Sequence, residues 1–576
     1  PDLSPLDPTG HTAASATLPR RGYVDVPFGQ VHYRIAGSGP PVVLLHDSPR
    51  SSAMHLDLMQ ALADEFTTIA LDTPGYGNSS PLPAEPRPEI PDFARALGDT
   101  LDALGLPPCP VYGFHTSSKI ALQLAVERPD RVAAVILDGL SLPPGPPDPE
   151  FIARYMLPFE PTTDGGYLVA QWTKIRDLHR FFPWFRREAA VRLPLDQPDE
   201  RALHRYGLDV FLAGPNWSSA YSAAMRYAAL PAIPRLATPT VFMARADDVL
   251  FPYLDALPQP LPAGCRIERL PADLDAWRGR LRTLFREFAG ETSALALPDP
   301  FADTGPGTRY GYVERASGQV RVRRYGHGGG RPLLLLHETP GGASTLDALA
   351  AALARDRTVY VPDLPGTGES DPLATPDVDG YTDALRDVVD TLGLAQFDLV
   401  AEFTATPLAV EFARQLPDRV HRVVLDGVFL LTSAERRELW RRYCPKVAPR
   451  ADGAHVVALW QRLRDQELSW PWYEGRREAI RRREPVLDAW HLHGQLLDAL
   501  RQPDHYGDAA TAAFDYPVKE RLEEVHVPAL LLRADGDPRY QWTDKAARRL
   551  GSVQVVARPA QAGERAAALR AFLDAG

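Results

Sequence analysis

The sequence predicts an α/β fold in two tandem copies, each a mostly parallel sheet wrapped by helices under a helical lid. Three observations lead to this prediction. The chain has 576 residues, far more than one hydrophobic core organises. Short apolar runs of strand length alternate with segments of helical spacing. A set of motifs from the first half returns in the same order in the second half.

Strand-like apolar runs recur along the first half of the chain. They lie at residues 41–46, 68–71, 111–114, 133–137 and 240–244, and residues 118–127 separate two of them with helical spacing. Runs that are apolar throughout are typical of strands buried on both faces. Their alternation with helices predicts a parallel sheet covered on both sides, and ligands of such sheets bind at the carboxyl ends of the strands.

A helical segment rich in proline and tryptophan interrupts this alternation at residues 141–234, and a similar one lies at 429–525. The first contains Trp172 and Trp184, which correspond to Trp460 and Trp472 in the second. We interpret each segment as a lid inserted over the strand ends.

The repeat sets the domain boundaries. His46-Asp47-Ser48-Pro49 is answered by His337-Glu338-Thr339-Pro340, and residues 72–79 are answered by 363–370. A stretch rich in proline and glycine lies between the copies, as in a linker. We predict a flexible tail at 1–20, a first domain at 21–290, a linker at 291–308 and a second domain at 309–576.

Composition and charge restrict the kinds of partner that we expect the chain to bind. The net charge of −11 comes from interspersed acids and bases, which argues against a nucleic acid or an anionic membrane and favours a small molecule. Cys109, Cys265 and Cys444 are far apart and lack metal-ligand spacing, so neither a disulfide framework nor a metal site is predicted. We expect a cytoplasmic protein without a cofactor or a membrane span. The sequence leaves open whether the chain forms a homo-oligomer.

With these elements in order, the chain resembles the α/β-hydrolase superfamily twice over nearly its full length. The resemblance rests on a His-x-x-Pro loop after a strand and on the turn Asp72-Thr-Pro-Gly-Tyr-Gly-Asn-Ser79. It implies a nucleophile elbow, G-x-S-x-G, which lifts a serine above the sheet. Here the elbows read Gly113-Phe-His115-Thr-Ser117 and Ala401-Glu402-Phe403-Thr404-Ala405. His115 and Phe403 therefore take the serine position.

The rest of the catalytic triad is incomplete as well. The resemblance assigns the triad acid to Asp247 in the first copy and to Asp537 in the second. The segments that would carry the histidine, 269–274 and 557–562, contain none. Losing the nucleophile or the base costs about 10⁶ in turnover. The sequence therefore predicts that neither copy catalyses ordinary serine hydrolysis.

A second departure lies in the loop that donates hydrogen bonds to the oxyanion. Where the family usually has glycine, the copies carry Asp47 and Glu338. A carboxylate there opposes a developing negative charge. Because both copies carry the change, we interpret it as part of a different chemistry.

These residues lead to a cofactor-independent enzyme acting on a small organic molecule, with a composition that suits bacterial secondary metabolism. We hypothesise that His115 is a general acid or base oriented by Asp247 or Asp47. Such chemistry serves an elimination, isomerisation, cyclisation or C–C cleavage. The residues predicted to bind substrate are Ser48, Thr116, Trp172 and Trp184. Those predicted to line a pocket of the second domain are Glu338, Glu402, Phe403 and Asp537, with Phe403 as a plug or wall.

Other interpretations stay open at this stage. Thr116, Ser117 or Ser118 could serve as a displaced nucleophile, or the chain could be a binding module without turnover, or a scaffold without a deep pocket. His115 could merely be hydrogen-bonded, and Asp47 could simply pair with Arg50. The lid tryptophans are most often core residues in such segments.

Overall fold

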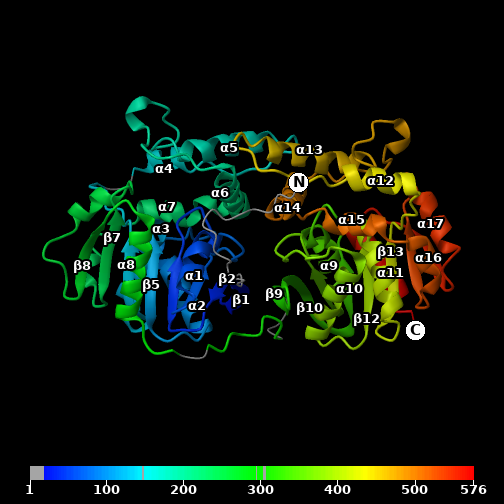
Figure 1. Cartoon of the computed structure of the whole chain (residues 1–576), viewed down its shortest axis with the longest axis horizontal. Helices are drawn as coiled ribbons and strands as arrows, with labels where there is room; N and C mark the ends of the chain where they lie inside the picture. Colours follow the sequence, from blue (N-terminus) through cyan, green and yellow to red (C-terminus); the bar gives the residue numbers. More distant parts are fainter. Residues whose placement is uncertain (1–18, 146–147, 293–294, 303–306, 576) are drawn as a thin grey trace, which may run out of the picture. The chain divides into compact units, whose positions relative to one another are not determined.

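The computed structural model describes residues 19–145, 148–292, 295–302 and 307–575 (Figure 1). By its contacts the chain divides into two compact units. The first unit holds Pro1–Pro147 with Ser218–Pro298, and the second holds Asp148–Trp217 with Asp299–Gly576, within the described residues. Residues 1–18 of the predicted tail lie outside those residues. The two copies begin at Arg20 and Thr308, each one residue before its predicted start.

The first unit is built on an eight-stranded sheet in the order β1-β2-β4-β3-β5-β6-β7-β8. Strands β3 to β8 run parallel, and β2 is antiparallel to both β1 and β4. The strands are β1 (Arg20–Val26), β2 (Gly29–Ala36), β3 (Pro41–Leu45), β4 (Thr67–Leu71), β5 (Cys109–Phe114), β6 (Val132–Asp138), β7 (Thr240–Arg245) and β8 (Cys265–Leu270). All five predicted strands are present.

Helices cover both faces of this sheet. They are α1 (Leu56–Leu62), α2 (Ile90–Ala103), α3 (Thr116–Glu127), α7 (Ser219–Arg226) and α8 (Leu274–Phe288). Leu58 of α1 and Phe285 of α8 share one apolar cluster with alternate residues of β3 to β7. The other face meets α2 and α3, where Phe93 and Ile120 lie near Leu45 and Leu71. The predicted α/β fold class is confirmed.

The second unit contains a seven-stranded sheet. Its path is β11-β10-β12-β13-β14-β15, with β9 paired to β10. The strands are β9 (Thr308–Arg315), β10 (Gly318–Leu336), β11 (Arg357–Pro362), β12 (Phe397–Glu402), β13 (Val420–Asp426), β14 (Ala529–Arg533) and β15 (Val553–Ala557). The long β10 first pairs antiparallel with β9 and then, after register shifts between Tyr325 and Leu333, lies parallel to β12. It therefore corresponds to both β2 and β3 of the first sheet.

The helices of this second sheet and of the two lids follow the repeat. Those on the sheet are α9 (Asp347–Leu353), α10 (Val378–Thr391), α11 (Thr406–Gln415), α15 (Asp508–Asp515), α16 (Val518–Arg521), α17 (Tyr540–Ala547) and α18 (Ala562–Leu573). The first lid has α4 (Pro149–Tyr155), α5 (Gly166–Leu178) and α6 (Glu200–Ala213), and the second has α12 (Ser433–Arg442), α13 (Ala454–Leu468) and α14 (Ala489–Arg501).

The first predicted lid does not stay in one unit. Its last helix, α7, packs on α2 and α3 in the first unit, where Lys119 Nζ donates to the carbonyl of Ala224 at 2.8 Å. Its earlier helices, α4 to α6, belong to the second unit. Residues 148–217 of the predicted first domain thus group with the second copy by their contacts, because α5 and α6 pack on the other lid.

The two lids meet in a reciprocal contact, which Figure 1 shows as α5 lying beside α13. The indole of Trp460 lies against Gly165, which precedes α5, and the indole of Trp172 lies against Gly453, which precedes α13. A Cβ added at Gly165 would come within 2.6 Å of Trp460 Cδ1. Trp172 Nε1 also donates to the carbonyl of Ala451 at 3.0 Å. Glycine at both positions lets each backbone approach the other lid's tryptophan.

Histidines repeat this reciprocity between α6 and α14. His204 Nε2 lies 3.0 Å from the carbonyl oxygen of Leu500, and His493 Nε2 lies 3.1 Å from that of Phe211. His204 Nδ1 faces His455 Nε2 at 3.1 Å, and His493 Nδ1 faces the Tyr167 hydroxyl at 2.7 Å. Corresponding residues of the two copies thus contact each other, as in the interface of a two-fold dimer.

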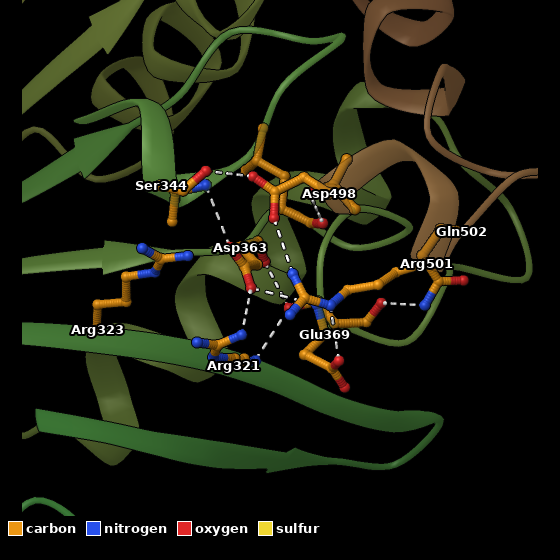
Figure 2. A network of polar contacts seen from close by, with 12 residues as sticks. Arg321, Arg323, Ser344, Asp363, Glu369, Asp498, Arg501 and Gln502 are labelled. Carbon is orange, nitrogen blue, oxygen red and sulfur yellow. Dashed lines mark hydrogen bonds and ion pairs between the residues drawn. The ribbon is translucent and has the colours of Figure 1, made fainter. Parts of the chain in front are cut away.

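A buried polar network ties α14 to the second sheet (Figure 2). Asp498 on α14 accepts from Ser344 Oγ at 2.5 Å and pairs with Arg501 Nη1 at 3.2 Å. Arg501 Nε also pairs with Glu369 at 2.9 Å, and the Glu369 backbone N–H donates to Asp363 at 3.2 Å. Burial and the nearby Asp363 charge raise the pKa of Asp498. Arg501 is thus the cation that holds two buried carboxylates of different elements together.

Gly453→Ala should destabilise the protein by about 2–4 kcal/mol, because it combines a positive φ with a clash against Trp172. The φ of Gly453 is 77°. Chemical denaturation of the full chain measures the effect. Gly475→Ala is the matched control in the same lid, since a Cβ there meets nothing within 4 Å. Equal stability of the two variants would contradict the lid contact.

Arg501→Met should cost about 3–5 kcal/mol, because it leaves two buried carboxylates without their shared cation. Arg278→Met removes a guanidinium from a solvent-exposed pair with Asp275 on α8 and should cost less than about 1 kcal/mol. Denaturant midpoints of both variants check the difference. A loss for Arg501→Met no larger than for Arg278→Met would show that the network does not hold α14 in place.

Candidate active site

The elbow of the first copy is the turn between β5 and α3, and His115 is the one residue between that strand and that helix. The backbone of His115 has φ 48° and ψ −107°, a conformation that costs an L-residue about 1–3 kcal/mol. Its N–H donates to the carbonyl of Asp138 at 2.9 Å, and its carbonyl accepts from Ser118 Oγ at 2.5 Å. These bonds hold the strained residue at the carboxyl ends of the central strands.

The His115 side chain forms a dyad with Asp248. Its Nε2 lies 2.8 Å from Asp248 Oδ2, while Asp248 Oδ1 accepts from the Leu250 N–H at 2.8 Å. The imidazole stacks on Phe114 with 4.0 Å between the ring centroids. A Cβ added at Gly139 would lie 2.5 Å from His115 Cδ2. The Nε2 edge is therefore enclosed by a glycine and a carboxylate.

The opposite edge of the imidazole carries no bonded partner in the part of the chain that the structure describes. Among the described residues, His115 Nδ1 has no hydrogen-bond partner, and 26% of the side chain is exposed. Because Asp248 accepts a hydrogen bond from Nε2–H, it favours the tautomer with a free lone pair on Nδ1.

Charges around the dyad favour a protonated imidazole. Burial acts to lower the pKa of His115, but the hydrogen bond and charge of Asp248, with the charges of Asp47 and Asp138, raise it above its ordinary value of 6.5. Burial acts to raise the pKa of Asp248, but the His115 contact outweighs it and the pKa of this carboxyl lies below its usual range. Both shifts favour the pair of imidazolium and carboxylate over the neutral pair.

The prediction that Asp247 orients His115 is wrong in register by one residue. The Asp247 carboxylate pairs with Arg245 at 2.9 Å and is 42% exposed. Both aspartates lie in the turn after β7, and the turn directs Asp248 to His115 and leaves Asp247 with Arg245. The pair Asp247-Asp248 was visible in the sequence, but nothing in it showed which of the two faces inward.

Asp47 lies near the dyad but does not bond to it. Its carboxylate is 2.5 Å from Arg50 Nε, and the Arg50 guanidinium lies over the Phe114 ring at 5.9 Å. Asp47 therefore acts on His115 through its charge, not as the hydrogen-bonded orienting group that the sequence suggested. Next to it, Ser48 is buried and hydrogen-bonds the phenol of Tyr76, whose pKa burial raises to about 12.

Asp138, at the end of β6, is a site residue that the sequence analysis missed. One of its oxygens accepts from the Tyr112 hydroxyl and from Trp277 Nε1, each at 2.8 Å. Burial raises the pKa of Asp138 to about 6. The repeat of Asp138-Gly139 as Asp426-Gly427 was its sequence signal, and Gly139 is the residue that makes room for His115.

The remaining predicted substrate contacts are placed differently. Thr116 is buried at the start of α3. Trp172 packs into the lid contact, and Trp184 is buried in its own lid with Nε1 donating to the carbonyl of Tyr155 at 3.0 Å. The geometry gives both indoles a packing role within the lids.

The elbow of the second copy keeps the strained backbone without a reactive side chain. Phe403 has φ 35°, and the Arg539 guanidinium lies over its ring at 3.7 Å. Asp537 pairs with Arg539 at 2.5 Å and with Arg481 at 3.1 Å. In the segment after β15, where the resemblance implies a histidine, Arg558 pairs with Asp426 at 2.7 Å. Arginine–carboxylate pairs thus occupy the place of a triad.

All four residues predicted for the second-domain pocket line one hollow of about 540 Å³. They are Glu338, Glu402, Phe403 and Asp537. Burial is the main cause that raises the pKa of Glu402 above its usual range, although Arg565 lies 2.9 Å away. The described parts of the chain contain no group of three potential metal ligands and no helix with the length and apolar character to cross a membrane.

Comparison with known proteins bears on both copies. A family model described as "alpha/beta hydrolase fold" matches residues 40–261 and 331–547. Haloalkane dehalogenase 2 of Mycobacterium tuberculosis is 38% identical over 109 residues, 19% of this chain and 38% of that protein. Bifunctional epoxide hydrolase 2 of Mus musculus is 35% identical over 136 residues, 22% of this chain and 23% of that protein. The chain thus spans less than two fifths of the length of these curated relatives.

Solved structures are also similar to parts of the chain. A hydrolase from Pseudomonas aeruginosa PA01 is 16% identical and covers 46% of this chain and 98% of its own, with a TM-score of 0.37. E-2-(acetamidomethylene)succinate hydrolase is 16% identical and covers 47% of this chain and 100% of its own, with the same TM-score of 0.37.

The His115 imidazole should titrate above pH 6.5, and Asp248→Asn should lower its pKa by removing the carboxylate. Because the folded-state pKa is raised, the ion pair contributes its full stability below about pH 6.5, and this contribution is lost as the pH rises through the folded value. NMR of the imidazole Cε1 signals, assigned with His115→Gln, measures the titration. A titration midpoint below pH 6.5 in the unaltered protein would contradict the hydrogen-bonded pair of His115 and Asp248.

Proposed function

The chain belongs to the alpha/beta hydrolase fold family, and from that premise we propose that its first copy is an enzyme in which His115 transfers a proton to or from a small organic molecule. The observation that carries this proposal is the dyad. His115 stands at the strained elbow with Nε2 bonded to Asp248 at 2.8 Å and with Nδ1 unbonded among the described residues. A histidine so oriented has the geometry of a general acid or base.

The proton moves through one atom of the imidazole. With Asp248 accepting from Nε2–H, the Nδ1 lone pair takes a proton from a substrate C–H or O–H. The imidazolium that forms is stabilised by the Asp248 carboxylate, and Nδ1–H then returns the proton to the leaving or rearranged group. Such transfer accounts for about 10²–10⁴ in rate, which suits an elimination, isomerisation, cyclisation or C–C cleavage.

The elbow hydroxyls do not support a displaced serine nucleophile. Ser117 Oγ donates to the carbonyl of Leu45 at 3.0 Å and accepts from the Phe114 N–H at 2.9 Å. Ser118 Oγ donates to the His115 carbonyl, and both side chains are buried. These hydroxyls are engaged in holding the elbow backbone.

The names of the curated relatives favour a second reaction of the same base. Both are named for hydrolysis or dehalogenation. The nearest alternative is therefore that His115 takes a proton from a bound water instead of from the substrate itself. In either case the first copy needs no serine and no cofactor for the proton step.

His115→Ala should lower the rate of a base-dependent reaction by about 10²–10⁴. Ring opening of 5-nitrobenzisoxazole needs only removal of a C–H proton, so it probes the base without knowledge of the natural substrate. The rate should rise with pH through the raised pKa of His115, because only the neutral imidazole accepts a proton. Absorbance of the phenolate product gives the rate.

The control is His505→Ala, which removes a half-exposed histidine paired with Asp508 in the other unit and should leave the rate unchanged. Asp248→Asn should shift the pH profile to lower pH. A rate unaffected by His115→Ala, or labelling of Ser117 or Ser118 by a fluorophosphonate, would overturn the proposal.

A further inference from the structure

The hollow of the second copy has phenylalanine at the elbow, where the family presents a nucleophile, yet it is lined by charge. Four carboxylates and four guanidiniums border it: Glu338, Glu402, Asp426 and Asp537, and Arg481, Arg483, Arg539 and Arg558. The lining is therefore neutral in sum. A buried neutral cluster stabilises an occupant whose own charges sum to zero better than an isolated ion, which would leave one charge uncompensated.

The positive charge gathers around Asp537. Arg539 binds it through Nε and Nη2, and Arg481 binds it through Nε, so two guanidiniums share one carboxylate. Their side chains are only 10% and 6% exposed. Burial and the charge of Arg539 lower the pKa of Arg481 to about 10. Among the described residues, Nη1 of Arg539 and Nη2 of Arg481 have no hydrogen-bond partner.

The carboxylate of Glu338 acts on Arg481, Arg539 and Arg558 through its charge, but from beyond ion-pair distance. Its carboxylate forms no hydrogen bond or ion pair with the residues that the structure describes. In the first copy, the corresponding Asp47 is neutralised by Arg50 at 2.5 Å. The repeat puts Gly341 where the first copy has Arg50, so the second copy has lost the cation and kept the carboxylate.

The two charged ends lie on opposite sides of the elbow. Glu338 follows β10, and Asp537 and Arg539 follow β14, with β12 and β13 between these strands. Phe403 and Gly427, which follow β12 and β13, line the same hollow. Neighbouring strands are about 4.8 Å apart, so an occupant that meets both ends spans several bonds.

We propose that this hollow binds a small zwitterion, an amino acid whose carboxylate is held by Arg481 and Arg539 and whose ammonium is held by Glu338. The free guanidinium N–H groups donate to the carboxylate, and Glu338 accepts from the ammonium, so each end gains charge-assisted hydrogen bonds. Phe403, at the elbow position, can act neither as a nucleophile nor as a base, so the proposal is binding without turnover at that position. The second copy is on this account a binding domain, and the proposal does not depend on catalysis by His115.

Calorimetry on the full chain tests the pairing of both ends. The probes are glycine, 4-aminobutanoate and 6-aminohexanoate, each compared with the carboxylic acid and the amine of the same chain length. At least one zwitterion should bind about tenfold or more tightly than both of its matched compounds, since each lost charge-assisted bond costs about tenfold or more. His115→Ala should bind it equally well.

Two variants assign the ends. Glu338→Gln should remove most of the zwitterion's advantage over the matched carboxylic acid, and Arg539→Lys should weaken both compounds by about tenfold. Glu438→Gln, an exposed acid on α12, is the control and should change nothing. Thermal melting confirms that each variant is folded. Absence of binding by every probe, or binding unaffected by Glu338→Gln and Arg539→Lys in folded protein, would overturn the proposal.

Discussion

A positive φ at one residue of each copy is the constraint on which both sites depend. A parallel strand that turns directly into a helix at the sheet's edge has to reverse within one residue, and that residue projects above the sheet. His115 and Phe403 both accept this conformation although neither is glycine. Surrounding bonds compensate the strain: the His115 carbonyl accepts from Ser118 Oγ, and the Phe403 carbonyl accepts from Thr406 Oγ1 at 2.8 Å. The fold thus keeps one position that projects its side chain above the sheet, whichever residue occupies that position.

The reciprocal lid contact gives the second copy a structural role. Trp172 and Trp460 exchange places against glycines of the opposite lid, and the carbonyls of Phe211 and Leu500 accept from histidines of the partner helix. In a homodimer such a contact would depend on protein concentration. Joined in one chain, the two lids meet at an effective concentration set by the linker, and the first lid is stabilised by a partner that need not turn over substrate.

The sequence predicts a residue's place where its neighbours along the chain decide its environment, and it fails where distant residues decide it. The strands at 41–46 and 111–114 were predictable because strands buried on both faces are apolar throughout. β1, β2 and β8 were not, since their partly exposed residues carry no such signal. His115 was found because the elbow fixes its position. Asp248 was missed because a one-residue register decides which aspartate faces inward, and Trp172 was assigned to substrate because its partner lies 279 or more residues away.

On the two functions proposed above, one scaffold separates catalysis from binding through its charged residues. In the first, Arg50 neutralises Asp47, and Asp248 is bonded, among the described residues, to the Leu250 N–H and to an imidazole that can gain or lose a proton. In the second, Asp537 meets two guanidiniums, which stay protonated at any physiological pH. A carboxylate facing a titratable partner supports proton transfer, whereas one facing permanent cations fixes a charge pattern. On these proposals, the residue opposite the acid, more than the acid itself, therefore decides what each elbow site does.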